Sequence, residues 1–178
     1  FAHPASIRAE APLVTLDSVV VTGTRSEHSS FDLPAAIDVV DRGRIDADRG
    51  RVNASEALAA VPGVTALNRQ NYAQDLQISS RGFGARSAFG VRGIRLVSDG
   101  IPASMPDGQG QAATFNLDRA ERIEVLRGPL SAVYGNHSGG VIQVFTPDGR
   151  GRPMIDSQLS GGSYGTWKLD LASHGEVG

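Results

Sequence analysis

The chain has 178 residues, of which 40% are hydrophobic, and a formal net charge of −2. It is therefore long enough to bury the core of one domain, and its charge gives no electrostatic case for binding nucleic acid. The absence of cysteine excludes disulfides, thiolate chemistry and cysteine-ligated zinc, while 22 glycines and 9 prolines predict a domain rich in turns. No apolar run in the sequence approaches the roughly 18 residues of a membrane-spanning helix.

The first predicted element is a short strand that follows an irregular tail. Residues 1–16 mix proline, alanine and scattered charge without a period, and they predict a mobile tail. Residues 17–23, DSVVVTG, predict an extended strand, because branched Cβ atoms suit a pleated backbone. This strand is either an edge strand of the domain or a donor segment that adds to the sheet of another protein through main-chain hydrogen bonds. The residues alone favour the edge strand.

A folded domain begins near residue 31, with one well-marked helix among short strands. Asn53 is a favourable N-cap and Glu56 stands three residues later, which is the spacing of a capping box. A helix is therefore predicted over 54–60, ended by Pro62 and Gly63. Turn residues and hydrophobic patterning predict strands at 37–40, 64–67, 76–80 and 94–97, a polar loop at 68–75 and a helical turn at 117–120.

The clearest pattern covers residues 121–146, ERIEVLRGPLSAVYGNHSGGVIQVFT. It predicts a buried strand, a break at Gly128 and Pro129, a helical turn, a glycine turn at 136–140 and a second buried strand. Proline imposes the break because it has no amide hydrogen to donate to a ladder. The stretch predicts a buried strand-turn-strand unit with the charges of Glu124 and Arg127 beside it.

Residues 81–93, RGFGARSAFGVRG, lie between two predicted strands. Glycine-rich turns can present backbone amides to phosphate, but Ser87 stands where a dinucleotide fingerprint requires glycine and no amphipathic helix follows, so a nucleotide enzyme is disfavoured. The arginines of this region either face an anionic ligand, since guanidinium groups match carboxylates, or pair with acidic neighbours. For each arginine taken singly, the residues favour pairing.

Residues 103–114 form a second long excursion between predicted elements. Their side chains are small or amide-bearing, and a loop of this length predicts recognition rather than mere connection. The histidines are scattered without ligand spacing at positions 3, 28, 137 and 174, so no metal site and no cofactor are predicted. The sequence shows no nucleophile placed with a base, so an enzyme is not predicted.

The last segment alternates between apolar and polar residues in two runs, 155–160 and 166–171, around a glycine-rich turn. Each run approaches the roughly 9 to 11 residues of a membrane β-strand with one apolar and one polar face. A soluble hairpin fits the same pattern. If the hairpin belongs to a barrel, two strands cannot close it, and most of that barrel lies outside this sequence.

Several separated motifs resemble, in order, those of the plug domain of TonB-dependent outer-membrane receptors. Residues 17–22 match the TonB box, 57–64 resemble the L-x-x-VPGV element, 80–82 match the RG segment, 97–102 resemble the DG-x-P loop, 122–135 match RIEVLRGP-x-S-x-x-YG and 139–142 resemble GGVI. The resemblance implies an α+β plug with a mixed four-stranded sheet and short helices, lodged inside a 22-stranded transmembrane barrel. It divides the chain into a periplasmic tail (1–16), a TonB box (17–23), a plug (24–149) and the first barrel hairpin (150–178).

A narrower resemblance, to the YncD/PqqU branch of these receptors, rests on residues 68–76, 81–93 and 101–111. It implies uptake of pyrroloquinoline quinone, a small tricarboxylate that would attract the arginines. Related plugs serve receptors for ferric siderophores, which is the alternative cargo, and a soluble periplasmic binding or interaction module is the alternative of another class. The ligand-binding residues expected from this resemblance are Arg86, Ser87, Phe89, Met105, Asp107, Gln109 and Gln111.

The resemblance also implies partners. TonB, with its inner-membrane energising complex, would bind the extended residues of the box in the periplasm, namely Asp17, Ser18, Val19, Val20, Val21 and Thr22. The receptor's own barrel would hold the plug in the outer membrane through Arg81, Glu124 and Arg127. Both arginines can instead pair within the plug. No nucleic acid, cofactor or catalytic residue is implied.

Overall fold

The computed structural model describes residues 20–21, 28–29, 36–47, 50–68, 70–71, 74–88, 90–127, 134–135 and 137–176. Several predicted features lie outside these residues: the tail, the box residues Asp17, Ser18, Val19 and Thr22, the ligand residue Phe89 and, except for residues 134–135, the helical turn after Pro129. Within the box, β1 (Val20–Val21) pairs antiparallel with β2 (His28–Ser29).

The organising element is a mixed sheet with the strand order β3-β10-β11-β7-β8. The predicted strand-turn-strand unit supplies its centre, since β10 (Arg122–Arg127) pairs antiparallel with β11 (Val141–Phe145). On either side lie β3 (Ala36–Asp41), antiparallel to β10, and β7 (Arg95–Ser98), parallel to β11. These four strands confirm the predicted mixed sheet.

The prediction of four strands omitted a fifth. The edge strand β8 (Ile101–Pro102) forms a tight hairpin with β7, in which Ser98 pairs with Ile101. Asp99 and Gly100 make the two-residue turn, with φ of 47° and 80°. Two residues at positive φ give a turn that matches the twist of paired strands, so the segment predicted as a loop continues the ladder.

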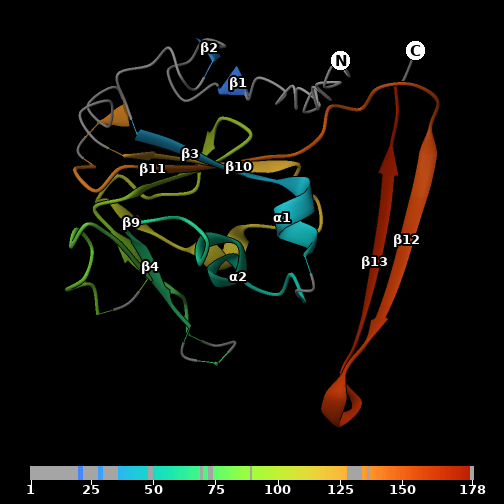
Figure 1. The fold of residues 1–178 in the computed structure, drawn as a ribbon, viewed down its shortest axis with the longest axis horizontal. Helices are drawn as coiled ribbons and strands as arrows, with labels where there is room; N and C mark the ends of the chain where they lie inside the picture. Colours follow the sequence, from blue (N-terminus) through green and yellow to red (C-terminus); the bar gives the residue numbers. More distant parts are fainter. Residues whose placement is uncertain are drawn as a thin grey trace, which may run out of the picture.

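Two short helices lie on one side of this sheet (Figure 1). In α2 (Ala54–Leu58), Asn53 caps the helix and Glu56 completes the capping box, which confirms the predicted start, while the helix ends before the predicted residue 60. The sequence pattern missed α1 (Arg42–Asp46), where the side chain of Asp41 accepts a hydrogen bond of 2.8 Å from the amide of Arg44. The segment predicted as a helical turn at 117–120 is a hydrogen-bonded turn, and a 3₁₀ helix, η1 (Ala112–Thr114), lies before it.

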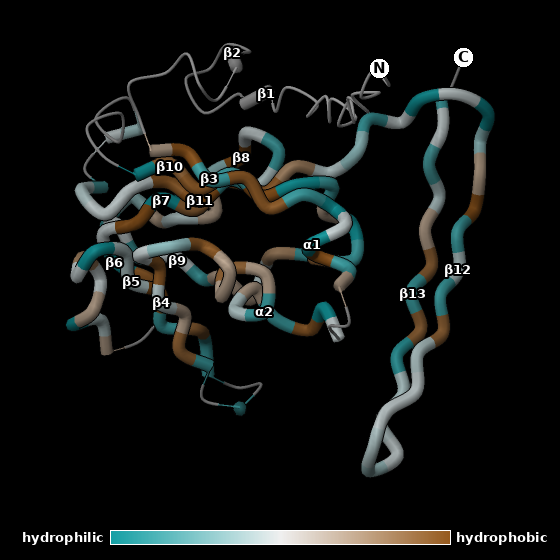
Figure 2. The backbone as a smooth tube through the Cα atoms, viewed as in Figure 1, coloured by the Kyte–Doolittle hydropathy of each residue, from teal (hydrophilic) through white to brown (hydrophobic). Residues whose placement is uncertain are grey.

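The core lies between the sheet and the helices, where the hydrophobic colouring of Figure 2 is concentrated. Alternation along β10 places Ile123 and Val125 in this main core and Leu126 in a smaller cluster on the other face. The main core also contains Leu58 of α2 and Leu96 of β7. Most of the side chains that cover this core come from the predicted strands and the predicted helix.

Two smaller ladders arrange the loops. The predicted strands at 64–67 and 76–80 form an antiparallel pair, β4 (Val64–Leu67) with β5 (Gln77–Ser80). The two segments predicted as recognition loops meet, because β6 (Val91–Arg92) pairs with β9 (Gln109–Gly110). The fold therefore brings residues 81–93 and 103–114 together.

The final hairpin, β12 (Met154–Gly161) with β13 (Trp167–His174), stands beside the rest of the chain, and its tip contains η3 (Ser163–Gly165) (Figure 1). Its outward face carries exposed apolar side chains at Ile155, Leu159, Trp167, Leu169 and Leu171. The opposite face carries polar residues toward the helices. Across the part of the chain that the structure describes, no helix is long and apolar enough to cross a membrane.

The close approach of β10 and β11 makes Gly140 a sensitive position. Its φ is +117°, and a Cβ there would lie 2.3 Å from the carbonyl oxygen of Leu126. We expect Gly140→Ala to lower the free energy of unfolding by more than about 2 kcal/mol, because the added atom both overpacks the sheet and strains the backbone. Urea unfolding measures the loss. Gly161→Ala is the matched control, since a Cβ at Gly161 meets no atom within 4 Å; equal losses for the two variants would contradict the prediction.

Candidate functional site

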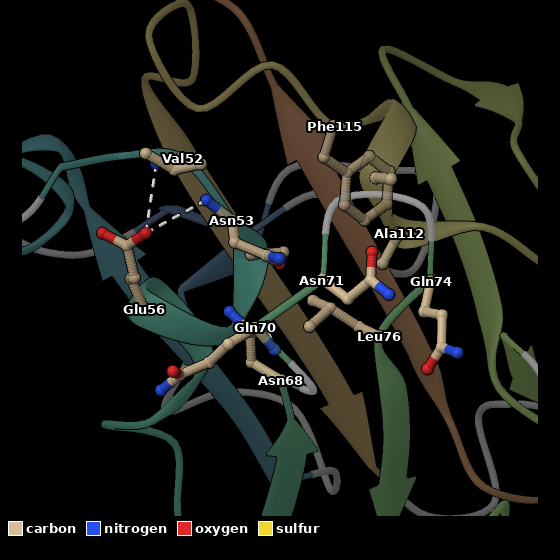
Figure 3. A pocket seen from close by; sticks show the side chains of 12 residues that line it. Val52, Asn53, Glu56, Asn68, Gln70, Asn71, Gln74, Leu76, Ala112 and Phe115 are labelled. Atoms are coloured by element: carbon tan, nitrogen blue, oxygen red, sulfur yellow. Dashed lines mark hydrogen bonds between the residues drawn. The ribbon is translucent and has the colours of Figure 1, made fainter. Parts of the chain in front are cut away.

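A cavity of about 470 Å³ opens between the β4–β5 loop, the start of α2 and the segment that contains η1 (Figure 3). Its described lining has two chemical parts. Carboxamides come from Asn53, Asn68, Gln70, Asn71 and Gln74, and apolar groups come from Val52, Ala54, Leu76, Ala112, Ala113 and Phe115. Glu56 is the one charged side chain among the described lining residues. We refer to this cavity as the amide pocket.

Glu56 organises the wall of the amide pocket that α2 provides. Its carboxylate accepts hydrogen bonds from the amides of Arg51 (2.9 Å), Val52 (3.1 Å) and Asn53 (3.1 Å), and Figure 3 shows the last two. A carboxylate that collects several backbone amides at the first turn of a helix satisfies donors that the helix itself leaves unpaired. The capping box therefore shapes the pocket as well as the helix.

Asp75 holds the opposite wall. Its Oδ1 accepts hydrogen bonds from the amide of Leu76 (2.9 Å) and from the amide of Ala113 (3.2 Å). The second bond joins the β4–β5 loop to the segment around η1. Inside the loop, the side chain of Asn68 accepts from the amide of Gln70 at 2.7 Å, and Gln70 has a φ of 52°. Such an Asx turn fixes the path of the loop and thus the position of its carboxamides.

The predicted ligand residues that the structure describes do not line the amide pocket. Arg86, Met105 and Gln111 are exposed. Asp107 accepts a hydrogen bond from the amide of Gln109 (3.0 Å) and lies 4.0 Å from Arg92. Ser87 is buried, and its hydroxyl donates to the carbonyl of Gly90 at 3.2 Å. The two loops meet as expected, but none of these side chains reaches the amide pocket: Arg86, Met105, Asp107 and Gln111 are exposed, and Ser87 is buried.

The sequence predicts a polar loop at 68–75 but no ligand-binding residue within it. Its signal was the run of amide side chains around position 70. The contributions of Asn53 and Phe115 carry no local signal, because they reach the pocket only through tertiary packing. Among the described residues, no group of three or more His, Asp or Glu side chains is arranged to hold a metal ion.

Arg81 and Arg127, predicted as barrel contacts, meet at the turn that ends α2. Arg127 donates to the carbonyl of Pro62 at 2.5 Å and forms an ion pair with Asp38 of β3. The amide of Arg81 donates to the carbonyl of Gly63 at 3.0 Å, while its side chain is exposed. Arg127 therefore pairs within the domain, and contacts of either arginine with a barrel stay a prediction.

Glu124 belongs to a different network. It is fully buried and forms an ion pair of 2.9 Å with Nε of Arg122, whose guanidinium lies 4.1 Å from the ring centroid of Phe145. Because side chains alternate along a strand, Glu124 and Arg127 point to opposite faces of β10. The structure separates two charges that their closeness in sequence had placed together.

The described contacts between the domain and the hairpin form a polar seam that the sequence did not predict. Asp118 lies 2.7 Å from Lys168, Arg119 lies 2.8 Å from Asp170, and Arg51 donates to Gln158. The three hairpin residues all belong to its inward face. Alternation in the sequence had marked this face as polar, but the pattern could not identify its partners.

The mixed sheet, the helices on one face and the adjoining two-faced hairpin define a plug-like domain that continues into a strand pair. A protein-family model described as the TonB-dependent receptor plug domain matches residues 29–141. The chain is a member of this family.

Known proteins agree with this assignment. The chain is 30% identical over 164 residues to a vitamin B12 transporter, BtuB, from Photobacterium profundum, covering 91% of this chain and 26% of that protein. It is 33% identical over 135 residues to a hemin receptor from Yersinia pestis, covering 74% and 18%. The pyoverdine receptor FpvA of Pseudomonas aeruginosa superposes with a TM-score of 0.68 at 21% identity, covering 89% of this chain and 22% of that structure, which supports the fold. The chain thus spans about a quarter or less of these relatives.

His137 predicts a pH dependence of folding. Burial and then the positive charge of Arg95 lower the pKa of His137 below the ordinary value of 6.5, and the main chain of Tyr134 opposes this to a smaller extent. The unfolded chain therefore binds a proton at His137 more readily than the folded chain, so this group costs no stability above about pH 6.5 and lowers stability as the pH falls below it. We expect His137→Gln to reduce the change in the urea-unfolding midpoint between pH 7 and pH 5. The same change of midpoint with pH in the variant and the natural sequence would contradict this role of His137.

Proposed function

We propose that the chain is the plug of an outer-membrane receptor that takes up a scarce ligand with energy delivered by TonB. Membership of the plug family supports the class of protein, and the exposed apolar face of β12–β13 fits the lipid-facing side of a barrel strand pair. In this proposal the plug lies inside the barrel, with its N-terminus in the periplasm. The plug gates passage and performs no chemistry on its cargo.

The amide pocket is the proposed contribution of the plug to ligand binding. In Figure 1, the β4–β5 loop and the tip of the β12–β13 hairpin point to the same side of the molecule, away from the C-terminal end. If the ends of the hairpin lie in the periplasm, this side faces the outside of the cell. Carboxamides both donate and accept hydrogen bonds, so the pocket suits a ligand with several hydrogen-bonding groups around an apolar body.

For the cargo, we propose a ferric siderophore or another metal chelate. The relatives named above are receptors for vitamin B12, hemin and pyoverdine, and an amide-lined pocket with an apolar floor fits cargo of this kind. Pyrroloquinoline quinone is the second candidate. Its carboxylates would favour guanidinium partners, which Arg86 and Arg92 offer on the exposed loop and which are absent from the described lining of the amide pocket.

A binding panel separates these candidates. We expect Asn71→Ala and Gln74→Ala in the complete receptor to weaken binding of ferric pyoverdine, hemin or cyanocobalamin about tenfold, because each removes a hydrogen bond of about 1.4 kcal/mol. Arg86→Ala serves as the control, with no expected change. Calorimetry with all three chelates and pyrroloquinoline quinone gives the affinities. Binding of the quinone alone, weakened by Arg86→Ala, would overturn the proposed cargo and favour the second candidate.

Energy coupling requires residues 17–22 to add as a strand to TonB. Val20→Pro removes one main-chain donor, so we expect it to abolish energy-dependent uptake and leave ligand affinity unchanged. Accumulation of labelled cargo by cells measures energy-dependent uptake, and binding to purified receptor measures ligand affinity. Undiminished uptake by the variant would reject strand addition at this segment. Recovery of the full-length protein from the soluble periplasmic fraction would instead support a soluble binding module.

A further inference from the structure

The amide pocket and the polar seam share a wall. Val52 lines the pocket and also two clefts between the domain and the hairpin, and Phe115 lines the pocket and one of these clefts. Arg51 stands directly beside Val52, at the point where the two sites meet. Its side chain is only 9% exposed, so it is a built part of the structure and not a surface charge.

The guanidinium of Arg51 joins three elements. It lies 3.0 Å from Asp46 of α1 and 3.3 Å from Asp118 in the turn before β10, and it donates to Gln158 of β12. The carbonyl oxygen of Arg51 accepts from Lys168 of β13 at 3.3 Å. This one residue therefore contacts both strands of the hairpin and two elements of the domain.

The backbone of Arg51 is held in an unfavourable conformation. Its φ is 52°, in the left-handed region, which costs a residue with a side chain about 1 to 2 kcal/mol. The amide of Arg51 donates to Oε2 of Glu56 at 2.9 Å, and this carboxylate lines the amide pocket. Glu56 thus holds the amide side of this strained residue from the pocket, while Lys168 of the hairpin holds its carbonyl oxygen.

We propose that Glu56, acting through Arg51, couples the amide pocket to the attachment between the plug and the hairpin. A ligand hydroxyl, amide or ammonium that donates to Glu56 competes with the amides of Arg51 and Val52 for the carboxylate oxygens. The backbone at residue 51 then relaxes, and its guanidinium leaves Asp118 and Gln158. This inference rests on the proposed role of the pocket as a ligand site.

The remaining seam contacts limit the size of the effect. The ion pairs between Asp118 and Lys168 and between Arg119 and Asp170 do not pass through Arg51. Release of Arg51 therefore loosens the seam without detaching the plug. Arg51 is a positioning residue in this scheme, and the ligand class that operates it is neutral or cationic with a free donor group, since an ionised carboxylate only accepts.

Thiol labelling measures this coupling without any ligand. These 178 residues contain no cysteine, and Ala172 on the inward face of β13 is only 8% exposed. In the complete receptor, with any cysteine outside these residues replaced by serine, Ala172→Cys therefore provides a reporter that reacts when the seam opens. We expect Arg51→Gly to raise the rate of maleimide labelling about tenfold, because glycine tolerates the backbone conformation but lacks the charged hydrogen bonds. Glu56→Gln should raise the rate severalfold, and the double variant should label no faster than Arg51→Gly alone.

Two controls keep the result interpretable. Glu121→Gln removes an exposed carboxylate outside the seam and should leave the rate unchanged. Asp118→Asn removes the ion pairs with Arg51 and Lys168 and leaves the sequence of residues 51–56 unchanged, so it shows that the reporter responds even if Arg51→Gly folds poorly. Two outcomes would overturn the coupling. One is a double variant, Glu56→Gln with Arg51→Gly, whose labelling rate rises by the product of the two single effects. The other is an unchanged labelling rate in Glu56→Gln alone. The ligand panel is independent: affinities that Asn71→Ala and Gln74→Ala leave unchanged would reject the proposed role of the pocket while leaving this measurement intact.

Discussion

Antiparallel pairing of β10 with β11 is the constraint on which the rest of the structure depends. The pair is buried on both faces, with the main core on one side and Leu126 beside the Glu124–Arg122 ion pair on the other. A buried ion pair of this kind is weak evidence for stability, but breaking it would leave a charge in the interior. The remaining strands add on either side of this pair, and the helices cover the face with the larger core.

The function proposed for the plug depends on loops and short helices that this sheet holds in place. The amide pocket draws its walls from the start of α2, the β4–β5 loop and the segment around η1. Each wall is fixed by a carboxylate that accepts backbone amides, Glu56 on one side and Asp75 on the other. Recognition is thus built from loops whose positions are set by side chain to main chain bonds, which is a common division of labour between scaffold and loop.

Much of the fold was predictable because its determinants are local. The capping box of Asn53 and Glu56, the apolar runs of β10 and β11 and the alternation of the hairpin all act over a few residues. The helix α1 was missed because five residues that include Gly43 show no apolar period. The pocket and the seam were missed for a different reason: Asn53, Asn71 and Phe115 are distant in sequence, as are Asp118 and Lys168, and only packing brings them together.

The carboxylate of Asp118 determines whether the charged side chains at the centre of the seam attract or repel each other. Asp118 lies within 3.3 Å of Arg51 and 2.7 Å of Lys168, so a single negative charge stands between two positive ones that belong to opposite sides of the contact. While it is present, each cation is attracted toward the same point. Without it, Lys168 would face the guanidinium of Arg51 with only Asp46, 3.0 Å from that guanidinium, left to offset the positive charge. In a partly buried cleft such Coulomb energies exceed those in water. At this point the hairpin is thus held to the plug by a bridging anion that both cations share.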